Sequence, residues 1–185
     1  KAKKLLEKLS IDKNQWYACL HLREGNYAGY SEVRNCSLEH YIPTINFINS
    51  IGGKVIKMGN KSMQKAPENV DLLDYATSEN KSDLLDLYLI NNCKLFIGTN
   101  SGLGMLAYLL KKDVINVNFH DFIGAFFGNS KGTLFKNFYL KPEKKKISPL
   151  ELINSNEYKD YIVNLLDNKS TNLIVEENTA EQILD

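Results

Sequence analysis

The sequence predicts an α/β fold in which helices flank a mostly parallel, Rossmann-like sheet. Strand and helix patterns alternate with short connections over about the central hundred residues. Residues 94–99 form a largely apolar run, which is typical of a strand buried on both faces of a parallel sheet. A length of 185 residues suits one domain, so we expect residues 1–185 to form a single unit.

Each strand is expected where a short run of β-branched, aromatic and other apolar residues is bounded by turn-forming residues. These runs cover residues 16–23, 54–59, 70–75, 94–99, 114–119 and 173–175. The helices are expected where apolar residues recur at helical spacing. These segments are 3–10, 37–52, 81–92, 101–112, 149–154, 157–166 and 179–184. Ser37 and Ser82 stand at N-cap positions, and Pro43 falls early in its helix, where a missing N–H is tolerated. The loop 120–128 and the lysine-rich stretch 141–146 are expected to be connections.

Composition argues against several functional classes. The 23 basic and 22 acidic residues nearly cancel, so we expect no general attraction to nucleic acid or to a membrane surface. The three cysteines show no C-x-x-C spacing, and reduced thiols in a cytoplasmic protein are the plain interpretation. No apolar run approaches the roughly 20 residues that a transmembrane helix needs.

The N-terminal residues indicate a fragment. The chain starts with Lys1, without an initiator Met, and no apolar segment of a signal peptide follows. An amphipathic stretch starts at once, so we expect the chain to be part of a longer two-domain protein.

The turn after strand 94–99 is the first candidate binding element. Gly102 and the small residues before it would let backbone N–H groups approach a phosphate, and the hydroxyls of Thr99 and Ser101 could donate further hydrogen bonds. Asn100 completes the turn. The same residue types are also common in ordinary turns and helix caps.

The end of strand 16–23 supplies the second candidate. Alternation puts His21 and Arg23 on one face, and a guanidinium can hold phosphate oxygens in a bidentate way. Arg23 and Arg34 are the only arginines among 23 basic residues. The alternatives are a structural histidine, a surface ion pair of Arg23 with Glu24 or Asp83, and an exposed position for Arg34.

A third candidate lies where the helix 81–92 begins. Ser82 and Asp83 could contact a ligand there, although a hydroxyl at the N-cap and a carboxylate in the first turn are what any helix start prefers. In a parallel sheet the carboxyl ends of the strands meet at one edge, and ligands bind there. We therefore expect the three candidates to lie near one another.

Taken in order, these segments resemble bacterial surface-polysaccharide glycosyltransferases that are distantly similar to the two-lobed, GT-B fucosyltransferases. The resemblance rests on His21-x-Arg23, Arg34-Asn35, Lys57-Met58-Gly59, Asp74-Tyr75-Ala76, Lys81-Ser82-Asp83, Phe96–Gly102 and the tail 174–183. It implies that this chain is the C-terminal half of a GT-B fold, which binds the nucleotide sugar.

The same resemblance implies roles for individual residues. Arg23, Thr99, Asn100, Ser101 and Gly102 would hold the diphosphate, and Ser82 and Asp83 would lie near the nucleoside. His21 and Arg34 are further possible contacts, as is Lys57, which stands where an arginine is expected.

The activity implied is transfer of a sugar, of hexosyl or fucosyl type, from a nucleoside-diphosphate sugar to a polysaccharide or another surface glycan. No Asp-x-Asp motif occurs, so we expect no metal and no cofactor, with Arg23 and the helix starting at Ser101 stabilising the leaving phosphate. The catalytic base is not identifiable in the sequence. The acceptor-binding N-terminal lobe is absent, so the isolated domain is expected to be inactive. The alternative is a non-catalytic nucleotide-binding or scaffold module with the same fold.

Residues 119–127 form an unusually apolar segment after a strand. It either packs in the core or faces something else, such as the other lobe, the base of the donor, or a second subunit in a homodimer. In the second case, at least two of Phe122, Ile123, Phe126 and Phe127 would be exposed in the isolated chain.

Overall fold

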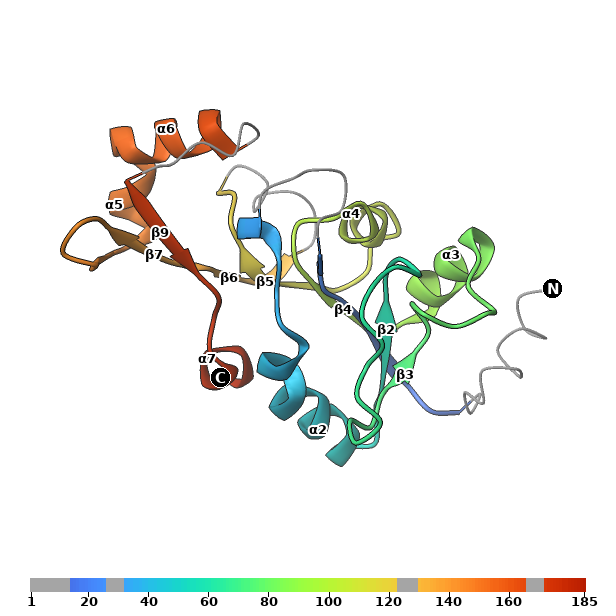
Figure 1. Ribbon diagram of the computed structural model, residues 1–185. Helices are drawn as coiled ribbons and strands as arrows, with labels where there is room; N and C mark the ends of the chain where they lie inside the picture. The colour runs from blue at the N-terminus through green and yellow to red at the C-terminus, as the bar shows by residue number, and fades with distance from the viewer. Residues whose placement is uncertain (1–13, 26–31, 123–129, 166–171) are drawn as a thin grey trace.

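The computed structural model describes residues 14–25, 32–122, 130–165 and 172–185 (Figure 1). Its main element is a six-stranded sheet in which every neighbouring pair of strands is parallel, with the order β3-β2-β1-β4-β5-β6. The strands are β1 Tyr17–His21, β2 Lys54–Met58, β3 Leu73–Asp74, β4 Leu95–Gly98, β5 Val114–Phe119 and β6 Ser130–Phe135. The chain builds outward from β1 to β3, then returns to the other side of β1 and continues to β6. This is the strand order of a Rossmann-like fold, and it confirms the predicted fold class.

Alternation along β1 explains how helices cover both faces of the sheet. Tyr17 and Cys19 pack against α3 Asp83–Asn92 and α4 Gly102–Leu109. Leu20 and its even-numbered neighbours instead face the 3-10 turn η3 Leu38–Tyr41, followed by α2 Ile42–Ser50, and the C-terminal helix α7 Ala180–Leu184. Both faces of β1 are therefore buried, as a central parallel strand requires.

A second, smaller sheet follows the first. It is antiparallel with the order β8-β7-β9, and its strands are β7 Asn137–Leu140, β8 Lys145–Ile147 and β9 Leu173–Glu176. Helices α5 Pro149–Ile153 and α6 Asn156–Leu165 lie beside it (Figure 1). The rings of Phe122, Phe138, Tyr158 and Tyr161 form its core, and the centroids of Phe122 and Tyr158 are 4.9 Å apart.

Most predicted elements of the large sheet are confirmed, with two kinds of correction. The strand expected over 70–75 is only Leu73–Asp74, because hydrogen bonds from Leu72 N to Val70 O and from Tyr75 N to Leu73 O turn the backbone on either side. β6, β7 and β8 lie where the sequence predicted no strand. The expected helix 3–10 lies outside the described residues.

The apolar segment 119–127 is partly described. Phe122 is 3% exposed and packs within the aromatic core, so it is not one of the exposed residues that a docking surface would need. Ile123, Phe126 and Phe127 lie outside the described residues. Among the helices that the structure does describe, none is both long and apolar enough to cross a bilayer.

Candidate functional site

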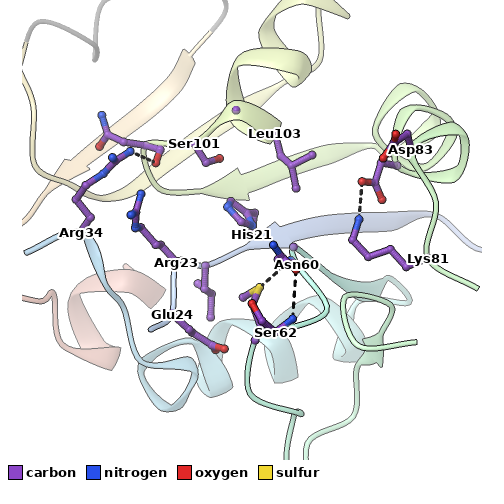
Figure 2. A pocket seen from close by; sticks show the side chains of 16 residues that line it. His21, Arg23, Glu24, Arg34, Asn60, Ser62, Lys81, Asp83, Ser101 and Leu103 are labelled. Atoms are coloured by element: carbon purple, nitrogen blue, oxygen red, sulfur yellow. Dashed lines mark hydrogen bonds and ion pairs between the residues drawn. The ribbon is translucent and has the colours of Figure 1, made fainter. Parts of the chain in front are cut away.

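A cavity of about 670 Å³ lies at the carboxyl edge of the large sheet, where the strand order reverses between β1 and β4 (Figure 2). Its walls come from the segments that follow β1 and β2, the start of α3, the turn between β4 and α4, and Arg34. Ligands of doubly wound sheets bind at this position, and the volume suits a small molecule. The predicted residues His21, Arg23, Arg34, Asp83, Asn100, Ser101 and Gly102 all line this cavity.

The N-terminus of α4 forms one wall. Ser101 is its N-cap, and the Ser101 hydroxyl accepts a hydrogen bond of 3.0 Å from Gly104 N–H. Gly102 and Leu103 also line the cavity, and the first N–H groups of a helix have no acceptor within the helix. A Cβ atom on Gly102 would meet nothing within 4 Å, which means that this position opens onto free space. Such a helix start attracts an anion.

The two arginines are held close to this wall by their backbones. Cys36 N–H donates to Arg23 O at 2.8 Å, which ties the segment of Arg34 to the end of β1. The Nη2 group of Arg34 donates to Asn100 O at 3.2 Å, next to Ser101. Lys136 is 4% exposed, and its Nζ donates to the carbonyl of Asn35 at 2.7 Å. Arg23 and Arg34 therefore line one side of the cavity, and Lys136 holds the backbone next to Arg34.

His21 occupies the middle of the cavity in Figure 2. Its Nδ1 lies 3.2 Å from Met58 O, a carbonyl that can only accept, so Nδ1 bears the proton. Burial lowers the pKa of His21 to about 4, and the ring is neutral near pH 7. Gly98 makes this packing possible, because a Cβ there would come within 3.1 Å of His21 O and 2.9 Å of the Phe96 ring.

The opposite side has a mixed charge. Lys81 and Asp86 form an ion pair of 2.6 Å, and Asp83 lies exposed in the first turn of α3. In the view of Figure 2, Arg23 and Arg34 lie toward one end of the cavity and Lys81 and Asp83 toward the other. The cavity is thus cationic at one end, while its other end offers both a carboxylate and an ammonium group.

Three predicted site residues do not line the cavity. Ser82 is the N-cap of α3, where its side chain accepts from Leu85 N–H, and both its N–H and its carbonyl bond to the Tyr75 hydroxyl. The Thr99 hydroxyl is buried and donates to Asn118 O at 3.2 Å. In both residues the polar groups bond to the protein itself.

Lys57 is also placed away from the cavity. It is fully buried, its Nζ donates to Gln64 O, and the carboxylates of Glu24 and Asp74 lie 3.5 Å and 4.0 Å from it. Lys57 thereby neutralises Glu24, whose backbone follows Arg23 and which lines the cavity. Lys57 therefore contacts residues that support the site and does not face the cavity itself.

The sequence interpretation missed some residues. Glu24, Lys81, Asp86 and Leu103 line the cavity, and His120 and Lys136 lie behind its cationic end. His120 follows β5 directly, so the rule that placed residues at strand ends could have found it. Nothing in the sequence indicates Lys136, which follows a strand that was not predicted. Within the described part of the chain, no group of three or more His, Cys, Asp or Glu is placed to hold a metal ion.

No protein-family model matches the chain, and no curated protein is similar to it in sequence. Solved structures do share its fold. The ADP-heptose lipopolysaccharide heptosyltransferase II of E. coli superposes with a TM-score of 0.53 and 13% identity, over 90% of this chain and 51% of that one. A family 9 glycosyl transferase from Veillonella parvula gives a TM-score of 0.51 and 10% identity, over 72% and 39%.

A third structure, UDP-GlcNAc 2-epimerase from Methanocaldococcus jannaschii, gives a TM-score of 0.48 and 15% identity, over 99% of this chain and 47% of that one. This chain therefore matches about half of each of these proteins, or less. At 13% and 10% identity, the likeness to the two glycosyltransferases establishes the α/β, Rossmann-like fold.

Proposed function

We propose that this chain is the donor-binding lobe of a two-lobed glycosyltransferase and that its cavity holds a nucleoside-diphosphate sugar. The observation that supports this most directly is the meeting of both arginines of the chain with the N-terminus of α4 at the strand-order reversal. Two glycosyltransferases share the fold, and their matched part is about half of each or less, as a single lobe would be.

The chemistry follows from the cationic end of the cavity. The diphosphate would accept hydrogen bonds from Arg23, Arg34 and the N–H groups at Gly102, and the nucleoside would extend toward Asp83. When the sugar departs to a polysaccharide or another glycan, negative charge grows on the leaving phosphate. Fixed arginines and a helix N-terminus stabilise that charge where they stand, so the proposal requires no metal. The base and the acceptor contacts belong to a second lobe.

The test is binding of UDP, GDP, ADP and CDP to the isolated chain by calorimetry, with and without EDTA. We expect one of them to bind equally well in both conditions. Arg23→Ala should weaken that binding by about 1.5–3 kcal/mol, as for a lost hydrogen bond to a charged group. Arg23→Lys should recover part of the loss, because a point charge cannot reproduce the guanidinium fork.

Lys131→Ala is the matched control, because Lys131 is an exposed cation that pairs with Asp113 and does not line the cavity. An equal loss in Lys131→Ala would mean that general charge drives binding. If none of the four nucleotides binds, the proposal is wrong and a scaffold role remains.

A further inference from the structure

His120 is a buried histidine behind the candidate site, and the proposed function has not yet used it. It follows β5 and is 4% exposed. Its backbone N–H and its ring Nδ1 both approach one atom, Oδ1 of Asn100, at 3.4 Å and 2.9 Å. Asn100 itself lines the cavity, between Thr99 and the N-cap of α4.

These two contacts fix the chemistry of both side chains. A backbone N–H can only donate, so the Asn100 atom that it approaches must be the amide oxygen and not the nitrogen. An amide oxygen can only accept, so the His120 Nδ1 beside it must be protonated. Asn100 is therefore held with its oxygen toward His120 and its Nδ2 group turned away.

The Asn100 backbone is engaged as well. Its carbonyl accepts from Nη2 of Arg34 at 3.2 Å. Both oxygens of Asn100 are thus occupied by the protein, whereas its Nδ2 group makes no hydrogen bond with the described residues. What Asn100 has left to offer a ligand in the cavity is a pair of N–H donors, beside the donors of Arg34 and of the α4 N-terminus.

The surroundings keep the His120 ring in this state. Burial and then the positive charges of Arg34, Lys136 and Arg23 lower its pKa to about 3, so the ring stays neutral near pH 7. Its Nε2 atom is buried and has no partner among the described residues. Within the described part of the chain, the ring therefore makes its one hydrogen bond through Nδ1, to Asn100.

We propose that His120 is a positioning residue that sets Asn100 as a hydrogen-bond donor to a phosphoryl oxygen of the ligand. The inference rests on the proposed function, because it takes the ligand to be a nucleoside diphosphate. It assigns the recognition of phosphate to a pair of residues that follow different strands, β4 and β5, and His120 itself does not touch the ligand.

The first test is a double-mutant cycle on the nucleoside diphosphate that the wild-type chain binds most tightly. His120→Leu removes the shorter, ring contact with Asn100 and leaves only the 3.4 Å contact from the backbone N–H. We expect it to weaken binding roughly tenfold, since the Asn100 amide is then held less firmly and presents its donors less often. His120→Asn keeps an N–H donor near the position of Nδ1 and should bind within about twofold of wild type. In an Asn100→Ala background, His120→Leu should have no further effect on binding.

A merely structural role for His120 would give a different pattern. His120→Leu would then weaken binding equally in both backgrounds, and His120→Asn would not rescue it. Either result overturns the inference while leaving the proposed function intact. If the wild-type chain binds none of UDP, GDP, ADP and CDP, both fail.

A second measurement does not depend on ligand binding. Nitrogen-15 NMR of the imidazoles should show His120 as the neutral tautomer protonated at Nδ1, with the signal assigned by its loss in His120→Asn. Observation of the tautomer protonated at Nε2, or of an imidazolium, near neutral pH would overturn the inference.

Discussion

Arg23 and Arg34 reach the cavity from segments whose backbones are already fixed. Cys36 N–H donates to Arg23 O at 2.8 Å, and the Nη2 group of Arg34 donates to Asn100 O. A long side chain that is ordered before binding loses less conformational entropy when the ligand arrives. How well these arginines bind therefore depends also on the backbone contacts made by Cys36 and Asn100.

Gly102 tests the approach of a ligand to the start of α4. We expect Gly102→Val to weaken nucleotide binding at least tenfold, because its side chain would fill the space in front of the first-turn N–H groups. Stability should change by less than about 1 kcal/mol, since the new side chain meets no atom of the described structure. Calorimetry and urea unfolding measure the two effects.

Gly132→Val is the matched control for that variant. Gly132 lies in β6, a Cβ atom there also meets nothing within 4 Å, and the residue does not line the cavity. Binding by Gly132→Val should equal that of wild type. Unchanged binding by Gly102→Val would exclude a ligand at the α4 N-terminus.

For individual residues, the sequence predicts site residues at strand ends better than site residues inside strands. The turn 99–102 and Arg23 were predicted from their place after a strand, and all but Thr99 line the cavity. Lys57 lies within β2, and its burial depends on Glu24, Asp74 and Gln64 from three other segments. No local pattern contains that information, because the partners are brought together only by the fold.

At the scale of elements, a polar network joins the C-terminal tail to the end of β5. Asn118 has a left-handed backbone with φ of 54°, and Asn118 and Asn178 exchange two hydrogen bonds of 3.1 Å and 2.6 Å through backbone N–H and side-chain oxygen. Asn118 Nδ2 also donates to the Tyr41 hydroxyl, and its carbonyl accepts from Thr99. Through the hydrogen bond from Thr99, the network therefore supports the turn that carries Asn100 and Ser101.

We expect Asn178→Ala to lower the free energy of unfolding by roughly 2–4 kcal/mol, because buried N–H and C=O groups lose their partners. Asn178 is 1% exposed, and its Nδ2 also donates to Phe135 O, at the end of β6. Urea denaturation followed by circular dichroism measures the loss.

Asn154→Ala provides the comparison for Asn178→Ala. The Asn154 amide makes one exposed hydrogen bond, to Leu150 O, so its removal should cost under about 1 kcal/mol. Equal losses in the two variants would show that the tail does not brace the sheet.

Two of the three strands that the sequence did not predict have little apolar character. β6 is Ser130–Phe135 and β8 is Lys145–Ile147, and both have exposed lysines. Lysines are common on sheet edges, where they discourage pairing with other chains, and they hide the strand from a search for apolar runs. β4 was found from its sequence because it is buried on both faces.

At the scale of the whole molecule, acid should unfold the chain through His21 and His120, whose rings are neutral in the folded state near pH 7. The folded-state pKa is about 4 for His21 and about 3 for His120, against an ordinary value near 6.5. Between these values the unfolded chain binds protons that the folded chain does not. The stability that the neutral rings contribute is therefore complete above pH about 6.5 and is lost as the pH falls toward about 4.

Urea unfolding at several pH values between about 7 and about 4 measures this decline. His120→Asn has one fewer titrating ring, so its stability should fall less steeply with acid than that of wild type. Parallel curves for the two proteins would contradict a depressed pKa at His120.

The pairing of Asn118 with Asn178 also affects the order in which parts of the domain can form during synthesis. The two residues are 60 positions apart, so a growing chain that already contains β1, β4, β5 and the turn before α4 still lacks the partner of Asn118. During synthesis the domain emerges from its N-terminus, and long-range contacts wait for their last member. The turn before α4 gains this support only after Asn178 has left the ribosome, so a nascent chain should form its sheet before the proposed nucleotide site is complete.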